Sequence, residues 1–202
     1  MSDKPIWALS ATELVKKTKN NDLSATEITF AYLEHIKTIN PELNAIVDDM
    51  SKEAIKRAEN LDSAAKSGDS KGRLFGVPVT VKINVDQKGY ATSNGVSALK
   101  NSIASQNAPI VDHLLNAGAI FVGRTNTQDI SFRAETENPL YGRTHNPWGK
   151  HLSPGGSSGG ASSAVMSGMC ALAHGNDIGL SLIHISEPTR LLSISYAVFC
   201  LK

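Results

Sequence analysis

The most unusual segment of the 202-residue chain is Gly155-Gly-Ser-Ser-Gly-Gly160. Three interpretations of it are open. A flexible linker of glycine and serine fits poorly, because an apolar helical segment follows at once. A phosphate-binding loop would need a lysine directly after the second glycine pair, where Ala161 stands. A catalytic loop would use the glycines, which carry no Cβ, to bring the backbone tightly around one serine.

A lysine at the end of an apolar segment is the second candidate for chemistry. Residues 77–81 are mostly β-branched and predict a strand, and Lys82 follows directly. A serine hydroxyl is a weak nucleophile that needs a nearby base. Burial disfavours the ammonium form of a lysine and lowers its pKa, which would make Lys82 such a base. By itself, a lysine in this place is more typical of a solvated strand end.

Other reactive side chains have no supporting spacing. Asp86 and Asp112 could form an acid–base pair, but no pattern places them together. His145 and His151 flank the glycine–serine segment without a zinc-binding spacing, and the two cysteines form no CxxC pair. The sequence therefore predicts no metal site.

Alternating helices and strands are predicted around these residues. Two capping boxes, Ser10-Ala-Thr-Glu13 and Ser24-Ala-Thr-Glu27, each begin a helix, and Pro41 is expected to end the second one. Strand, helix and strand in succession indicate an α/β fold with parallel strands. The remaining predictions are helices over residues 51–66, 109–117 and 161–169, and strands over residues 77–81, 119–122 and 171–173.

Composition excludes several classes of protein. The chain has 20 Lys and Arg against 19 Asp and Glu and no basic run, which argues against a nucleic-acid partner bound through bulk charge. The start of the chain lacks the layout of a signal peptide. The apolar segment Leu191–Leu201 is too short to cross a bilayer. We expect a soluble, cytoplasmic protein with no membrane partner, and nothing in the sequence indicates its oligomeric state.

Six motifs together resemble the amidase signature family, and the resemblance covers about residues 9–179. It implies a single α/β domain with a mixed, mostly parallel sheet sandwiched by helices, of which this chain holds the N-terminal part. The motifs occur in the family's order. They are Gly76-Val-Pro-Val-Thr-Val-Lys82, Gly123-Arg-Thr-Asn126, Thr136-Glu-Asn-Pro139, Asn146-Pro-Trp148, Gly155–Gly160 and Gly175-Asn-Asp-Ile-Gly179.

The resemblance implies an amidase that hydrolyses a small-molecule carboxylic amide through a serine acyl-enzyme, with no cofactor. In this family a Ser-cisSer-Lys triad carries the reaction. Lys82 matches the base, Ser157 the bridging serine after a cis peptide bond, and Ser181 the position of the nucleophile, with Ser158 as the alternative bridging serine. The other residues implied are an oxyanion hole of Ile178, Gly179 and Leu180, and the signature-loop glycines Gly155, Gly156, Gly159 and Gly160.

The chain departs from the family pattern at two places. Lys82 is followed by Ile83-Asn84, where Lys-Asp-Asn is usual. After Gly179 the family continues Gly-Ser-Ile-Arg, and a Cβ at Leu180 is expected to block the backbone path of the oxyanion loop. Residues 180–202 instead resemble a translated sequencing-adapter read-through. We therefore expect an amidase part over residues 1–179, a non-family tail over residues 180–202, and a chain that is inactive as it stands.

Two alternatives to a general amidase remain. The first is the amidase subunit of glutamyl-tRNA(Gln) amidotransferase, which works with a partner chain. The segment Gln128-Asp-Ile-Ser-Phe-Arg133 resembles the general amidases more closely. The second is a non-catalytic polypeptide, either truncated or artefactual.

Overall fold

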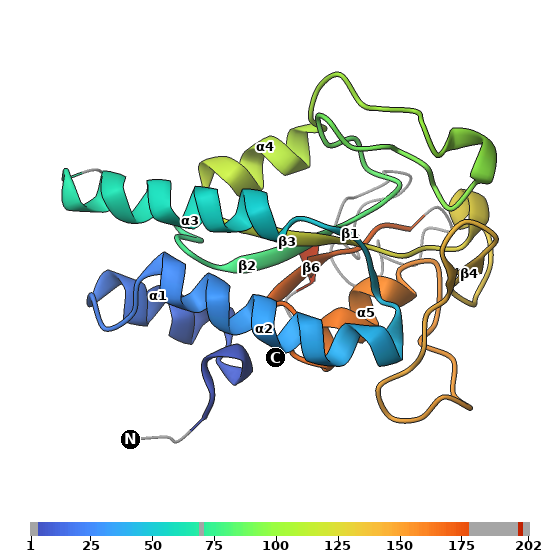
Figure 1. The fold of residues 1–202 in the computed structure, drawn as a ribbon, viewed down its shortest axis with the longest axis horizontal. Helices are drawn as coiled ribbons and strands as arrows, with labels where there is room; N and C mark the ends of the chain where they lie inside the picture. The colour runs from blue at the N-terminus through green and yellow to red at the C-terminus, as the bar shows by residue number, and fades with distance from the viewer. Residues whose placement is uncertain (1–3, 69–70, 178–197, 200–202) are drawn as a thin grey trace, which may run out of the picture.

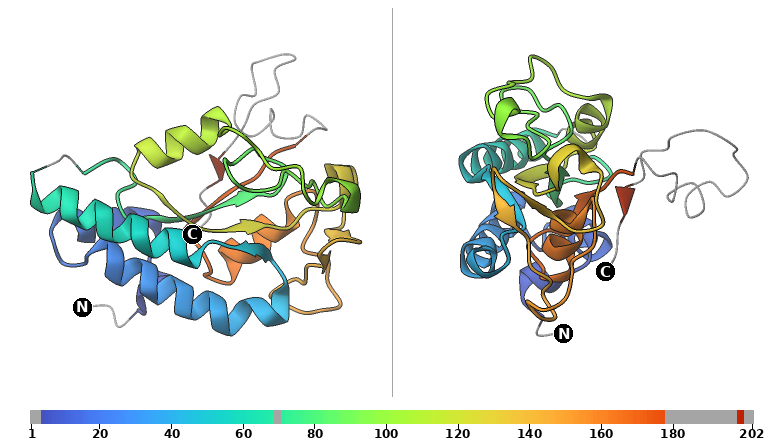
Figure 2. Two further views of the ribbon diagram at one scale, coloured as in Figure 1. Left: turned by 45° about the horizontal axis from the view of Figure 1, so that its top comes forward. Right: turned by 90° about the vertical axis from the view of Figure 1, so that its right-hand side faces the viewer.

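The computed structural model describes residues 4–68, 71–177 and the backbone of 198–199. They form a five-stranded sheet with helices on both sides (Figures 1 and 2). The three central strands run parallel and each edge strand runs antiparallel to its neighbour. The expected α/β fold with a mixed sheet is thus confirmed. In spatial order the strands are β1 (Ile46–Asp49), β3 (Ile120–Thr125), β2 (Pro78–Lys82), β6 (Leu172–His174) and β7 (Val198–Phe199).

The first two helices begin where their capping boxes place them. In both capping boxes the serine hydroxyl accepts a backbone N–H and the glutamate accepts the serine N–H in return. In the described part of the chain, every helix is too short or too polar to cross a bilayer. The helices are α1 (Ala11–Lys19), α2 (Ala25–Leu43), α3 (Ser51–Lys66), α4 (Pro109–Asn116) and α5 (Gly159–Met166). The smaller elements are the 3-10 turns η1 (Ile6–Ala8), η2 (Ser97–Leu99) and η3 (Asp129–Ser131), and a hairpin of β4 (Glu137–Asn138) and β5 (Gly142–Arg143).

Several details of the sequence-based prediction are wrong. Helix α2 passes through Pro41 and ends at Asn44, whose left-handed φ of 49° ends the helix. Proline removes one hydrogen bond there, but the extra turn buries Leu43 in the core. Helix α5 spans residues 159–166 instead of 161–169, and β3 continues to Thr125. Strand β1 was not predicted, because its four residues gain their extended form from pairing with β3.

The side chains on the two faces of β2 contact different parts of the protein. Side chains alternate between the faces of a strand. Val79 and Val81 pack into a cluster that includes Val111 and Leu114 of α4. Thr80 and Lys82 therefore face the opposite side, where α5 lies, and the Thr80 hydroxyl is 3.5 Å from the Cys170 sulfur. All five residues of β2 are buried, as expected of a parallel strand covered on both faces.

The carboxyl ends of the three parallel strands meet at one edge of the sheet. Strand β2 ends at Lys82, β3 at Thr125 and β6 at His174. A polar residue lies two positions beyond each of these ends, and open α/β sheets bind their ligands at this edge. The fold therefore gathers Asn84, Thr127 and Asn176 beside Lys82.

The start of α5 lies against backbone, which makes Gly160 a position where only glycine fits. A Cβ there would lie 2.5 Å from the backbone N and O of Asn126 and 2.9 Å from the carbonyl oxygen of Ala45. We expect Gly160→Ala to lower the free energy of unfolding by about 3 kcal/mol, since these backbone atoms are fixed by the sheet and cannot withdraw. Urea denaturation measures the change.

Gly155→Ala is the matched control for this substitution. Gly155 has a φ of +82°, and a Cβ added there would meet no atom within 4 Å. The only expected cost is that of an alanine in a left-handed backbone conformation, which lowers the free energy of unfolding by about 1 kcal/mol. Equal losses for the two variants would show that close contact at Gly160 does not limit stability.

Candidate active site

The side chain of Lys82 ends in a ring of polar atoms. It is fully buried, in contrast to a lysine at a solvated strand end. Its Nζ lies 2.7 Å from Ser157 Oγ, 3.0 Å from Asn176 Oδ1 and 3.3 Å from Ser158 Oγ. The structure thus brings the predicted base and both candidate bridging serines together from segments 75 residues apart.

Burial changes the protonation of this amine. Removal of water lowers the pKa of Lys82 to about 7, and the nearby charge of Asp177 opposes the shift. At neutral pH a large fraction of Lys82 is therefore uncharged and has a lone pair that can accept a proton.

Ser157 is held by its backbone. The peptide bond between Gly156 and Ser157 is cis, and the Ser157 carbonyl accepts a 2.9 Å hydrogen bond from the Thr127 hydroxyl. A Cβ on Gly156 would lie 2.5 Å from the Arg133 carbonyl oxygen, so the loop packs closely on its neighbours. The glycine–serine segment is therefore a packed loop and not a flexible linker.

Hydrogen-bond directions separate the two serines. The Ser158 hydroxyl lies 3.2 Å from the Asn176 carbonyl oxygen, to which it can donate, and accepts the Asn176 N–H at 3.3 Å. A hydroxyl has one hydrogen, so Ser158 can only accept from Lys82 when its own hydrogen is used in this way. Among the hydrogen bonds of the described residues, the Ser157 hydroxyl contacts Lys82 alone. Of the two hydroxyls, Ser157 is therefore the one whose hydrogen is not directed at another acceptor among the described contacts.

His174 lies next to this group at the end of β6 and is fully buried. Burial lowers its pKa to about 4, and the charge of Lys82 contributes in the same direction. The imidazole is therefore neutral at physiological pH and adds no positive charge beside the lysine.

Two asparagines belong to the site although sequence analysis assigned them no role. Asn176 Oδ1 accepts from Lys82, and Asn84 and Asn176 exchange hydrogen bonds of 3.1 and 3.2 Å between their side-chain amides. Both residues lie two positions beyond the end of a parallel strand. That position, with the rule for the carboxyl ends of such strands, is the signal that could have identified them.

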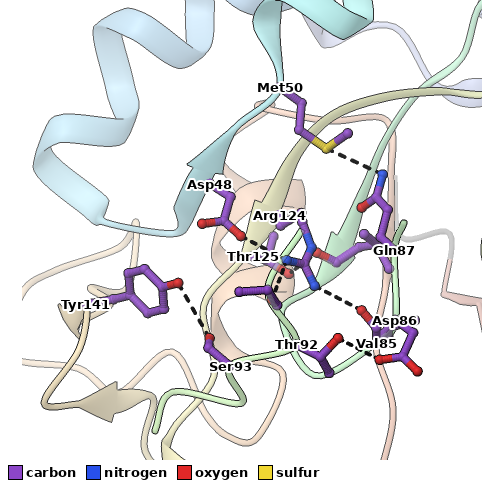
Figure 3. Close-up of polar contacts among 12 residues, drawn as sticks. Asp48, Met50, Val85, Asp86, Gln87, Thr92, Ser93, Arg124, Thr125 and Tyr141 are labelled. Atoms are coloured by element: carbon purple, nitrogen blue, oxygen red, sulfur yellow. Dashed lines mark hydrogen bonds and ion pairs between the residues drawn. The ribbon is translucent and has the colours of Figure 1, made fainter. Parts of the chain in front are cut away.

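The segment after Lys82 is fixed by Arg124 of β3, whose side chain is fully buried. Figure 3 shows the Arg124 side chain beside Asp48 and Val85. Its guanidinium donates to the carbonyl oxygens of Val85 and Ala91 at 2.9 and 2.7 Å, and to the Asp48 carboxylate at 3.0 Å. Tyr90 lies against the same group, with its ring centre 5.6 Å away. Burial lowers the pKa of Arg124, and Asp48 opposes this. Arg124 therefore connects two points of the loop that follows β2, Val85 and Ala91, to the sheet.

The other predicted site residues are placed as follows. The proposed nucleophile Ser181, the oxyanion residues Ile178, Gly179 and Leu180, and the tail over residues 180–202 lie outside the described residues, apart from the backbone of strand β7. Asp86 and Asp112 accept hydrogen bonds from Thr92 and Asn107 and belong to no acid–base pair among the described contacts. No group of three or more His, Cys, Asp or Glu residues suited to a metal ion occurs in the described part of the chain.

Comparison with known proteins decides the family. The profile described as Amidase matches residues 27–183. The chain belongs to the amidase family. An acylamidase from Rhodococcus erythropolis is 40% identical to this amidase-family chain over 177 residues, covering 88% of the chain and 37% of that protein. Indoleacetamide hydrolase from Bradyrhizobium diazoefficiens is 48% identical over 178 residues, covering 88% of the chain and 34% of that protein.

Solved structures agree with this family. A bacterial aryl acylamidase of the amidase signature family matches with a TM-score of 0.84 and 30% identity, over 87% of this amidase-family chain and 37% of the other. Fatty acid amide hydrolase matches with a TM-score of 0.83 and 30% identity, over 89% and 32%. The resemblance stated from the motifs is confirmed, and the chain spans about a third of the length of the relatives it matches.

Proposed function

We propose that this chain is the N-terminal part of an amidase, which hydrolyses a carboxylic amide through a serine acyl-enzyme. One observation carries the proposal: the buried amine of Lys82 lies 2.7 Å from the hydroxyl of Ser157, in a packed glycine–serine loop. A dehydrated lysine and a serine in direct contact form a base and a proton relay, which is what an otherwise weak serine nucleophile needs.

The proton path follows from this contact. The nucleophilic serine attacks the carbonyl carbon while its proton passes to Ser157, whose own proton passes to Lys82. Collapse of the tetrahedral intermediate breaks the C–N bond, and the proton returns from Lys82 through Ser157 to the leaving amine. Water then hydrolyses the acyl ester by the same route. Ser181, 24 residues after Ser157, stands at the family's nucleophile position, although it lies in the tail that the sequence analysis assigns outside the family.

The substrate class is taken from the relatives. Two of them are named an indoleacetamide hydrolase and an acylamidase, which supports a small-molecule amide as substrate. A glutamyl-tRNA(Gln) amidotransferase chain from Caldanaerobacter subterraneus is less similar, at 35% identity. We propose a cytoplasmic enzyme that needs no cofactor and binds neither nucleic acid nor membrane.

A hybrid enzyme tests the proposal. Residues 1–179 of this chain replace the corresponding part of the Bradyrhizobium indoleacetamide hydrolase, and release of ammonia from indole-3-acetamide is followed. We expect the hybrid to turn over, and Ser157→Ala to lower kcat by about 10²–10⁴-fold, because the relay to the base is lost. The intact Bradyrhizobium protein is the positive control.

Ser158→Ala is the matched variant. Its oxygen makes only a 3.3 Å contact with the amine, so we expect a loss below about tenfold. A folded hybrid without activity would contradict the proposed function. Equal losses at Ser157 and Ser158 would contradict the assignment of Ser157 as the relay.

A further inference from the structure

A neutral primary amine can act as a base only along its lone pair. It has two N–H donors and one lone pair, so its neighbours decide which way the lone pair points. Lys82 Nζ has three polar neighbours, at 2.7, 3.0 and 3.3 Å. Proton transfer from Ser157 is favoured when the other two, Asn176 and Ser158, take the two N–H groups, and Asn176 is the nearer acceptor of the two.

The orientation of Asn176 is set by a chain of hydrogen bonds that starts outside the amine. The single hydrogen of the Ser131 hydroxyl is directed at Asn94 Oδ1, 2.9 Å away, or at the Thr127 hydroxyl, 3.1 Å away. In either case Ser131 accepts from Asn84 Nδ2, which lies 3.1 Å away. Asn84 therefore presents its oxygen to Asn176 Nδ2, at 3.2 Å. Asn176 in turn presents its own oxygen to Lys82.

A flipped Asn176 amide would have the opposite effect. Its NH₂ group would then face Lys82, and the lone pair of the amine would turn to Asn176 and away from Ser157. The NH₂ group of Asn84, 3.1 Å from Asn176 Oδ1 in the structure, would also lose its acceptor. The reciprocal pair of amides excludes this arrangement, because two donors would face each other.

The oxygen that takes the N–H is also uncharged. A carboxylate at the same distance would stabilise the ammonium form of Lys82 and reduce its value as a base. The charged and titratable groups that face the amine are Asp177, which favours the ammonium form, and His174, which is neutral. The loop of Ser157 and Ser158 contributes only hydroxyls.

We propose that the amide pair of Asn84 and Asn176 is a positioning element that directs the lone pair of Lys82 toward Ser157 and keeps an uncharged acceptor on the amine. This inference rests on the proposed function, because it assigns a task to the same base. Neither asparagine touches the reacting atoms of the substrate, and both act through Lys82.

The first experiment measures the protonation of Lys82 directly in the 202-residue chain. Lysines are labelled with ¹³C and ¹⁵N, the Lys82 signal is assigned from its loss in Lys82→Arg, and its NMR shift is followed against pH. We expect a midpoint near 7 in the wild type and a midpoint at least one pH unit higher in Asn176→Asp, which is a change of about tenfold or more in the acid dissociation constant. Asn101→Asp, at an exposed position, is the matched control and should leave the midpoint unchanged.

The second experiment tests orientation in the hybrid enzyme. Asn176→Leu removes the acceptor without adding charge, and we expect kcat to fall about tenfold or more with KM within about twofold. Asn84→Leu should give a smaller fall of the same kind, since it releases the Asn176 amide without touching the amine. Folding of each variant is checked by its two-dimensional NMR spectrum.

The outcomes separate the two proposals. If Lys82 of the wild type titrates at its ordinary value of 10.5, the proposed base is wrong and the function falls with it. If the wild type titrates near 7 and the hybrid is active, but Asn176→Asp leaves the midpoint unchanged or Asn176→Leu retains its kcat, the positioning role of the pair is overturned while the function stands.

Discussion

Lys82→Ala is expected to lower kcat of the hybrid enzyme by about 10²–10⁴-fold, which is the range that a general base contributes. The substitution removes the proton acceptor that lies 2.7 Å from Ser157. Asn176 and Ser158 cannot replace it, because an amide and a hydroxyl are not basic. Ammonia release from indole-3-acetamide measures the effect. Lys100→Ala, at an exposed lysine, is the control and should retain full activity.

The dependence of kcat on pH identifies the base more specifically than the loss of kcat in Lys82→Ala does. In the proposed mechanism the uncharged amine is the active form, so kcat should rise with pH through about 7 and then level off. Lys82→Ala should remove this dependence from the residual activity. In the proposed mechanism Lys82 and Ser157 act as one relay, so the double variant Lys82→Ala/Ser157→Ala should be no slower than either single variant. Multiplied losses would show that the two residues act independently.

Lys82 also affects the free energy of unfolding, and the direction of this effect follows from its pKa. The unfolded chain holds a proton on this lysine up to its ordinary value of 10.5, whereas the folded chain releases it near 7. Between these values the unfolded state binds more protons, so this group makes the folded state more stable as the pH rises. Lys82→Met should therefore melt no lower than the wild type at pH 7. This separates loss of activity from loss of folding.

Sequence analysis predicted the features that depend on local signals. Both capping boxes locate helix starts, because a serine and a glutamate three residues later satisfy the first backbone N–H groups without help from the rest of the fold. Helix α3 was likewise predicted with its observed bounds, since its alanines follow a helical period.

The features that were missed depend on distant contacts. Pro41 lies within α2 because burial of Leu43 outweighs one lost hydrogen bond. Strand β1 exists through its register with β3, where Ile46 pairs with Thr125, and a four-residue segment carries too little pattern to indicate this. The buried pairing of Arg124 with Asp48 joins residues 76 positions apart. No sequence period predicts such a contact.

The candidate site likewise contains residues that the sequence analysis identified and residues that it missed. The motifs identified Lys82 and Ser157, and the structure places them in contact. Asn176 lay inside a quoted motif and Asn84 beside a departure from the family pattern, yet neither received a role. An amide side chain has no pKa and no metal preference that would distinguish it in a sequence. Its importance follows only from the direction of its hydrogen bonds to a neighbour.

Arg124→Leu is expected to cause a large loss of stability outside the reacting groups, comparable to that of Gly160→Ala. It leaves the Asp48 carboxylate without its cation and two carbonyl oxygens of the loop after Lys82 without their donor. Breaking a buried ion pair costs about 3–5 kcal/mol. We expect a value near the lower end, about 3 kcal/mol, because 23% of the Asp48 side chain is exposed and water can partly replace the arginine. Urea denaturation of the 202-residue chain measures the loss.

A second arginine provides the control, since the same substitution can be made in an exposed ion pair. Arg143 lies 3.5 Å from Glu135, and their side chains are 37% and 54% exposed, so Arg143→Leu should cost no more than about 1 kcal/mol. Arg124→Lys should recover only part of the loss, because a lysine cannot donate in three fixed directions to Asp48, Val85 and Ala91. Full recovery by lysine, or equal losses at the two arginines, would show that charge alone acts at position 124. In that case, packing contacts other than those of Arg124 would hold the loop that carries Asn84 in place.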